Sequence, residues 1–450
     1  MTIASIILAA GEGTRMRSKM PKVLHKLAGK PMVWHAMQAV RGLVDSPPVL
    51  VVGFRADAVK AAIGDQAAYA LQHEQLGTGH AVAAARPILE GKADQILVTF
   101  ADMPLLKKTS LVDLIALHRS GKSPVTMMSF IGEEARGFGR VVRDEAGHVT
   151  AIVEQVVATP EQLAICEYNV SAYCFEAAWL WSALERIPLS PKGEYYLTDV
   201  VELAAAEGFK VASLVLDDPD DAIGPNNRVH LAMAEKVMRW RINQNWMLEG
   251  VTIVDPDTTY IESDVVIGRD TVIHPNTHLR GKTVIGEDGQ IGPDTTVIDS
   301  QIGNRVELIS SVLESAQVAD DVTMGPFCHL RKGAILDQGV HLGNFAEVKD
   351  SYLGVGTKMG HFSYIGNATI GRDVNIGAGT ITCNYDGEKK HPTEIGDEVF
   401  LGSDTMLVAP VKIGDRSITG AGAVVTHDVP PDTLVIGVPA KEKCKLEKSD

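Results

Sequence analysis

Residues 8–24 read LAAGEGTRMRSKMPKVL and continue a short apolar run that begins at residue 3. The apolar run predicts a buried strand. Gly11 and Gly13 allow backbone N–H groups to approach a ligand at the end of that strand. The four basic residues that follow supply charge against phosphate. An ordinary strand and turn with a solvated basic surface would show the same spacing, because short glycine motifs also arise by chance. The stretch alone therefore favours an anion-binding turn without establishing one.

The first 229 residues alternate short apolar runs with helical patterns. The expected strands are residues 3–10, 49–53 and 96–100, and the expected helices are residues 31–40, 57–62 and 110–118. This alternation predicts a doubly wound α/β sheet with parallel strands. Ligands of such sheets bind outside the carboxyl ends of the strands. The glycine-rich turn and Asp102, which follows the third run, are both expected there.

Residues 230–249 have a different pattern. Met233, Val237, Trp240 and Met247 recur at helical spacing, and neither glycine nor proline interrupts them. This predicts one amphipathic helix that links two domains and ends at Gly250.

Apolar residues recur every six positions after residue 251, often with glycine next to them. A period of six fits neither an α-helix nor a coiled coil, and it predicts the short strands and turns of a parallel β-helix. The segment 380–393 interrupts the period and is expected to leave the coil as a loop. Three phases carry the repeat, and Thr419 is the only polar member of the third: Ile267, Ile273, Leu279, Ile285, Ile291 and Val297; Val306, Val312, Val318, Met324, Leu330, Leu336, Leu342 and Val348; and Ile395, Leu401, Leu407, Ile413, Thr419 and Val425.

The bulk composition restricts the class of protein. A chain of 450 residues is long enough for two or three domains. The formal net charge of −15 argues against a nucleic-acid or membrane-surface binder. The five cysteines show no metal-binding or disulfide spacing, and no apolar run is long enough to span a bilayer. We therefore expect a cytoplasmic protein without a membrane segment, and the open flanks of a solenoid predict an oligomer.

The chain resembles, over nearly its whole length, the bacterial bifunctional N-acetylglucosamine-1-phosphate uridylyltransferases/glucosamine-1-phosphate acetyltransferases. The first half matches at residues 8–16 (LAAGEGTRM), 21–25 (PKVLH), 75–80 (QLGTGH), 102–104 (DMP), 137–140 (GFGR), 193–199 (GEYYLTD) and 226–228 (NNR). The second half matches at residues 343–345 (GNF), 360–361 (GH), 375–380 (NIGAGT), 383–387 (CNYDG) and 402–405 (GSDT). The first set indicates a sugar nucleotidyltransferase, and the second set, inside a hexapeptide repeat, indicates the bifunctional family.

The resemblance implies three parts: a uridylyltransferase domain at 1–229, a linker helix at 230–250, and a left-handed β-helix with acetyltransferase activity at 251–450. It also implies a homotrimer formed through the β-helix. The two reactions would supply UDP-N-acetylglucosamine for peptidoglycan and lipopolysaccharide synthesis.

In the first reaction, UTP and N-acetylglucosamine 1-phosphate give UDP-N-acetylglucosamine and pyrophosphate. Catalysis is then mostly positioning and charge neutralisation, for which Arg15 and Lys22 are the candidates. The resemblance assigns Mg²⁺ to Asp102 and Asn227, which fits the preference of this ion for oxygen ligands. The resemblance also implies uracil contacts at Gln72, Gly77 and Thr78, sugar contacts at Gly139, Glu154 and Asn169, and further nucleotide-sugar contacts at Leu8, Ala9, Ala10, Gly11 and Phe100.

In the second reaction, acetyl-CoA acetylates glucosamine 1-phosphate. An amine that attacks a thioester must lose a proton, and a neutral imidazole suits that task. The resemblance assigns the base to His361, which Glu347 would orient or assist. It implies sugar-phosphate contacts at Arg331, Lys349, Tyr364 and Asn375, and acetyl-CoA contacts at Ala378, Asn384, Tyr385, Ser403 and Ala421. A ping-pong route through Cys383 is the less favoured alternative, because the family transfers the acetyl group directly.

Two rival functions remain open at this point. The protein could be a nucleotidyltransferase whose β-helix is only structural, which the set around His361 argues against. It could also be an inactive scaffold like some subunits of translation-initiation exchange factors. Retention of Arg15, Lys22 and Asp102 argues against that alternative.

Overall fold

The structure is a computed structural model, and it describes residues 1–133, 135 and 137–445. The chain divides into two compact units, Met1–Met238 and Arg239–Asp450. Helix α9 (Arg228–Leu248) contains the division. The finer boundaries at 229/230 and 250/251 stay predictions.

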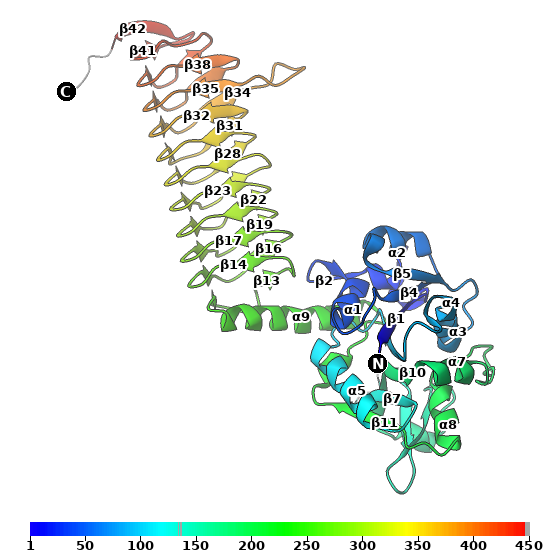
Figure 1. The fold of residues 1–450 in the computed structure, drawn as a ribbon. Coiled ribbons are helices and arrows are strands. Elements are labelled where there is room, and N and C mark those ends of the chain that lie inside the picture. Colours follow the sequence, from blue (N-terminus) through cyan, green and yellow to red (C-terminus); the bar gives the residue numbers. More distant parts are fainter. Residues whose placement is uncertain (134, 136, 446–450) are drawn as a thin grey trace. The chain divides into compact units, whose positions relative to one another are not determined.

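A mixed sheet forms the centre of the first unit (Figure 1). Its path is β11-β7-β10-β6-β1-β4-β5, where the strands are β1 (Ile3–Ala9), β4 (Val49–Val52), β5 (Ala68–Leu71), β6 (Gln95–Phe100), β7 (Val125–Ile131), β10 (Glu167–Glu176) and β11 (Ala212–Leu216). The expected parallel arrangement is confirmed for β1, which pairs in parallel with β4 and with β6. Strand β10 runs antiparallel to both of its neighbours, and β8 (Arg140–Arg143) and β9 (Val149–Val153) form a hairpin beside it.

Helices cover both faces of this sheet, as a doubly wound fold requires. Alternate residues of β1 enter different cores: Ile6 and Leu8 belong to one cluster, and Ile7 to the other. The three expected helices are present as α1 (Met32–Val40), α2 (Ala56–Ile63) and α5 (Lys108–Ser120). The remaining short helices are α3 (Thr78–Ala83), α4 (Arg86–Leu89), α6 (Pro160–Leu163), α7 (Ala177–Leu184) and α8 (Asp199–Ala206), with 3₁₀ turns at η1 (Thr14–Met16), η2 (Lys22–Leu24), η3 (Gly64–Gln66) and η4 (Pro219–Ala222).

The second unit is the expected parallel β-helix, in which short strands stack turn upon turn (Figure 1). Three sheets run along it: a 12-stranded sheet from β12 (Thr252–Ile253) to β42 (Lys441–Lys445), a 10-stranded sheet from β13 (Tyr260–Ile261) to β40 (Val424–Val425), and a 9-stranded sheet from β14 (Val266–Ile267) to β38 (Val411–Ile413). Thr323 pairs with His341 and His341 with Lys358, so these turns take 18 and 17 residues. The final strand, β42, reverses and pairs antiparallel with β41 (Thr433–Ile436).

The hexad positions point into the coil with one exception. Every member of the three phases is buried except Val312, which is 39% exposed. The interpretation of Val312 as an inward residue is wrong, because Thr296 pairs with Val312 only 16 residues later. This short turn moves the inward position to Leu313, which is fully buried. The polar Thr419 is also buried, and its hydroxyl is paired with that of Thr405 at 2.7 Å.

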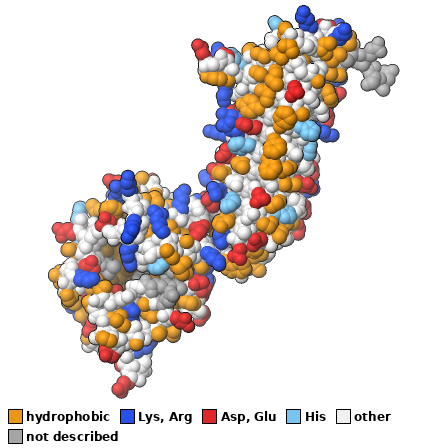
Figure 2. All heavy atoms as spheres, turned by 180° about the vertical axis from the view of Figure 1, so that it is seen from behind, with side chains coloured by type: hydrophobic (Ala, Val, Ile, Leu, Met, Phe, Trp, Pro, Cys, Tyr) orange, Lys and Arg blue, Asp and Glu red, His pale blue; other side chains and the backbone are white. Residues whose placement is uncertain are grey.

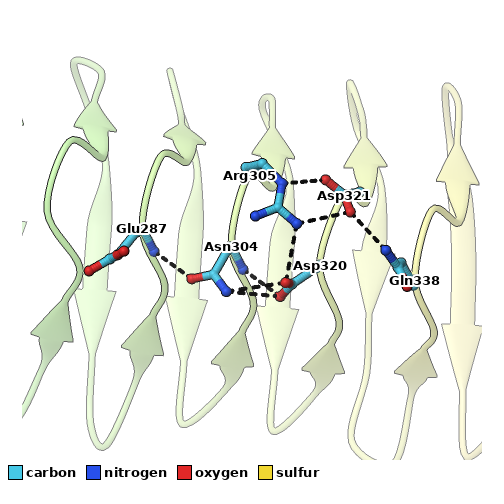
Figure 3. A network of polar contacts seen from close by, with 6 residues as sticks. All are labelled: Glu287, Asn304, Arg305, Asp320, Asp321 and Gln338. Carbon is cyan, nitrogen blue, oxygen red and sulfur yellow. Dashed lines mark hydrogen bonds and ion pairs between the residues drawn. The ribbon is translucent and has the colours of Figure 1, made fainter.

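Polar side chains satisfy the backbone at the corners of the coil. Inside, buried threonine hydroxyls donate to carbonyl groups three residues earlier, as Thr283 does to Arg280 and Thr380 to Gly377. Outside, a ladder of side chains connects successive turns (Figure 3). Asn304 accepts from the Glu287 N–H and donates to Asp320, while Arg305 is paired with Asp321. Hydrogen bonding therefore continues from turn to turn where the strands are interrupted.

Helix α9 has contacts in each unit. In the first unit, Ala234 is buried and Glu235 accepts the Ala28 N–H at 3.0 Å. In the second unit, the buried Asn243 donates to the carbonyl groups of Pro256 and Thr259, and the Arg239 guanidinium lies over the Tyr260 ring. The end of α9 therefore covers the first turn of the coil. Nowhere in the described part of the chain is a helix both long and apolar enough to cross a membrane.

Candidate functional sites

A cavity of about 440 Å³ opens at the carboxyl ends of β1 and β6 in the first unit. Predicted site residues that line it are Leu8, Ala9, Ala10, Gly11, Arg15, Lys22, Gln72, Gly77, Thr78, Phe100, Asp102 and Glu154. Residues that line it without having been assigned a role from the sequence include Gly13, Gln75, Glu194, Tyr196 and Asn226. The signal for these five was their place inside the quoted motifs, which did not say which members face the ligand.

The glycine-rich turn places Lys22 at the centre of this cavity. Gly13 has a φ of +67°, and a Cβ there would collide with the Cβ of Lys22. Lys22 Nζ donates to Asp102 Oδ2 at 2.6 Å and to Asn226 Oδ1 at 2.7 Å. Gly11 has open space where its side chain would be, so the backbone is accessible at that point. The turn thus combines an exposed backbone with a fixed cation.

Gln72, Gly77 and Thr78 form one wall of the cavity. Gln72 Nε2 donates to the Gly77 carbonyl at 3.0 Å, and Thr78 Oγ1 accepts the Leu197 N–H at 2.9 Å. Gly77 has a φ of +98°, and a Cβ there would collide with the Tyr195 backbone. The wall is therefore held by the segment around residue 195, which is remote in sequence.

Glu154, Gly139 and Asn169 are close together through shared contacts. The Asn169 N–H donates to the Gly139 carbonyl at 2.9 Å, and a Cβ on Gly139 would lie 3.6 Å from Glu154 Oε1. The Asn169 side chain donates to the Tyr173 hydroxyl at 2.6 Å, and its Oδ1 accepts the Ser171 N–H. Burial raises the pKa of the Glu154 carboxyl. Only Glu154 of the three lines the cavity itself.

The two proposed metal ligands differ in their surroundings. Asp102 faces the cavity beside Lys22, whereas Asn227 Oδ1 accepts the His230 N–H at 2.9 Å at the start of α9. A carbonyl oxygen has two lone pairs, so this cap leaves Asn227 able to bind an ion. Among the described residues, no three His, Cys, Asp or Glu side chains gather as a metal cage. A carboxylate and an amide oxygen fit Mg²⁺, which needs few protein ligands when phosphates supply the others.

The coil carries a cluster of cations on the outer face of its 10-stranded sheet. Lys349 lies on β28 (Ala346–Lys349), and Arg331 follows β25 (His329–Leu330) one turn earlier. The nearby Lys390 ammonium, together with Arg331, lowers the pKa of Lys349. Glu347 accepts a hydrogen bond from Arg331 at 3.0 Å, and its role toward His361 stays a prediction. Lys390 was not assigned from the sequence, because it lies in the loop that interrupts the repeat.

Tyr364 and Asn384 lie beside this cluster. Lys349 pairs with Gly366 in the ladder to β31 (Ser363–Gly366), and a Cβ on Gly366 would collide with the Tyr364 hydroxyl and lie 2.8 Å from Asn384 Nδ2. Asn384 opens the expected loop, whose ends are bridged between Tyr385 and Lys390. Asn375 lies on the 12-stranded sheet, one sheet away. The coil thus brings together residues from several turns, with the interruption at 380–393 confirmed.

His361 and the predicted acetyl-CoA residues occupy one corner of successive turns. The Gly379 N–H donates to the Phe362 carbonyl, the Asp404 N–H to Ala378, and the Gly422 N–H to Ser403. Ala378, Ser403 and Ala421 therefore form a line that continues from His361 along the coil axis. Adjacent strands are about 4.8 Å apart, so this line suits an elongated ligand.

Comparisons with known proteins agree with both halves. Residues 5–194 match the family model of the MobA-like NTP transferase domain. Residues 264–299 and 392–427 match the model of the bacterial transferase hexapeptide (six repeats). The second unit is accordingly a left-handed β-helix built from hexapeptide repeats.

Proteins named bifunctional protein GlmU are similar over nearly the whole chain. The protein from Pelobacter propionicus is 48% identical over 96% of this chain and 95% of its own length. Those from Heliobacterium modesticaldum and Streptococcus agalactiae are each 45% identical, over 96% and 97% of this chain and 94% and 95% of their own lengths. The chain therefore belongs to the family of bifunctional GlmU proteins.

Proposed function

We propose that the cavity of the first unit forms UDP-N-acetylglucosamine and that the corner around His361 acetylates glucosamine 1-phosphate. The protein is a bifunctional uridylyltransferase and acetyltransferase, with nucleotide and acetyl-CoA as substrates. The observation that carries the assignment of sites is the meeting of Gly11, Arg15, Lys22 and Asp102 in one cavity. That arrangement has backbone, cations and a carboxylate where two polyanions must be joined.

In the uridylyl site, the chain's own residues bind and neutralise charge. The open backbone at Gly11 receives the triphosphate, and Arg15 and Lys22 stabilise charge on the transferred phosphoryl group and on pyrophosphate. Gln72, Gly77 and Thr78 hold the uracil, while Glu154 and Asn169 hold the acetylated sugar. Asp102 and Asn227 would hold Mg²⁺, which when bound neutralises phosphate charge.

In the acetyltransferase site, Arg331, Lys349 and the newly found Lys390 bind the phosphate of the sugar, because three neighbouring cations are stabilised by an anion. His361 takes the proton from the attacking amine. Acetyl-CoA lies along the corner formed by Ala378, Ser403 and Ala421, with Asn384 and Tyr385 beside it.

We also propose a homotrimer and a cytoplasmic location. Figure 2 shows exposed hydrophobic side chains gathered along the coil. Phe327 and Phe345 are each 60% exposed and stack on each other, and Phe362 is 56% exposed. An exposed apolar strip of this kind supports self-association, which a light-scattering mass would test. The five cysteines are all free thiols, in keeping with a reducing compartment.

Two assays test the assignment of sites in the full-length protein. Pyrophosphate release from UTP and N-acetylglucosamine 1-phosphate should fall about 10³-fold in Asp102→Asn. Release of free CoA from acetyl-CoA and glucosamine 1-phosphate should fall about 10³-fold in His361→Ala. Each variant serves as the control for the other reaction, and His341→Ala is the matched histidine on the coil. Loss of both activities in either variant would contradict two separate sites.

A further inference from the structure

Lys22 occupies the place at which a cation would approach Asp102. Its Nζ lies 2.6 Å from Asp102 Oδ2 and 2.7 Å from Asn226 Oδ1, so two oxygen atoms from distant parts of the chain converge on it. The Lys22 side chain is 10% exposed and that of Asp102 is 31% exposed. The ammonium is therefore held in a mostly buried position by the kind of oxygen atoms that bind divalent ions.

An ammonium ion and a divalent ion cannot share this position. Mg²⁺ contacts carboxylate oxygen at about 2.0–2.1 Å, and the Lys22 charge would repel it at close range in a partly buried site. Without a nucleotide, Lys22 has only Asp102 as an anionic partner. The phosphates of UTP would provide the ammonium with another, on the side of the cavity lined by Gly11 and Arg15.

We propose that Lys22 is an internal placeholder cation, held on Asp102 by Asn226 until a nucleotide draws it away. Free metal then binds Asp102 weakly, and metal and nucleotide bind together rather than in sequence. Asn226 is a positioning residue in this scheme, because it acts through Lys22. The inference rests on the proposed metal site at Asp102.

Binding of Mn²⁺ to the nucleotide-free protein, measured by electron paramagnetic resonance, tests the proposal without any turnover. Lys22→Met should tighten Mn²⁺ binding on the order of tenfold, since it removes the competing charge. Lys22→Arg keeps the charge and should leave binding weak. Asn226→Ala frees Lys22 and should tighten binding by a smaller factor. Lys19→Met removes an exposed charge from the same stretch and should change nothing.

Two further results would overturn the proposal in distinguishable ways. If Asp102→Asn abolishes Mn²⁺ binding but Lys22→Met binds no more tightly than the unsubstituted protein, Lys22 is not a placeholder. If Asp102→Asn leaves Mn²⁺ binding unchanged, the metal assignment itself fails, and the placeholder fails with it. Weaker binding in Asn226→Ala would make Asn226 a metal ligand and exclude its role as the holder of Lys22. Matching circular dichroism spectra exclude misfolding as the cause.

Discussion

In the first unit the candidate residues surround a cavity of about 440 Å³, whereas on the coil His361, Asn375, Tyr385, Ser403 and Ala421 are exposed. The cavity arises because loops after several strands curve over one edge of a sheet. The coil has flat faces and regular corners, so its residues form lines instead of a hollow. A single chain thus encloses one ligand, but it presents only one wall to the other. This difference is a physical reason to expect that neighbouring copies complete the acetyltransferase site.

The two units also differ in how they bury polar groups. The first unit buries whole imidazoles: burial lowers the pKa of His118 to about 4 and also lowers the pKa values of His25 and His35. The coil buries small hydroxyls that donate to nearby carbonyls, such as those of Thr283 and Thr380. Hydroxyls do not titrate in this range, so the stability of the two units should respond differently to acid.

The largest effect should come from the interior of the coil. Leu342→Ala removes a fully buried side chain and should lower the unfolding free energy of the second unit by about 3 kcal/mol. Hydrogen exchange resolved by segment would locate the loss. Val312→Ala is the matched control, since this hexad residue is exposed and should change stability by much less. Equal losses in the two variants would contradict the revised register.

A substitution in the glycine-rich turn should separate the two activities. Gly13→Ala places a methyl group against Lys22 at a positive φ and should reduce uridylyl transfer about 10²-fold. CoA release should stay within about twofold, because the coil has its own site. Gly137 also has a positive φ but open space around it, so Gly137→Ala tests the effect of backbone strain alone. A similar loss in Gly137→Ala would argue against the contact with Lys22.

Acid should destabilise the first unit before the coil. The folded pKa of His118 lies below its ordinary value of 6.5, so the unfolded state binds the proton more readily. Full stability is therefore present above about pH 6.5 and is lost as the pH falls toward about 4, by about 2 kcal/mol for this group. His118→Asn should remove that part of the pH dependence, as measured by hydrogen exchange of β7 at pH 7 and pH 5. An unchanged dependence would assign it to other groups.

The smallest effect is expected at the outer ladder of Figure 3. Arg305 pairs with Asp321 on the surface, and exposed ion pairs contribute little to stability. Arg305→Ala should leave the denaturation midpoint of the coil unchanged within error. A clear decrease would show that the outer corners, and not only the apolar interior, hold the turns together.

Periodicity predicted the folds of both units because it reports which residues face a core. The six-residue repeat identified the coil, and the strand and helix alternation identified the α/β sheet. The same signal failed at Val312, since a turn of the coil had lost residues and the register had moved. It could not find Lys390, because a loop that leaves the repeat has no period. It also gave no role to Asn226, whose contact with Lys22 joins residues far apart in the chain.

The sequence by itself determined the two folds, the family resemblance and most of the residues that now face the cavity, because motifs and periods are local properties. The tertiary structure alone decided which of these residues touch. It placed Lys22 between Asp102 and Asn226, brought Lys390 to Lys349, and aligned Ala378 with Ser403 on one corner. These contacts depend on the return of distant segments to one place in space, and no local pattern records that return.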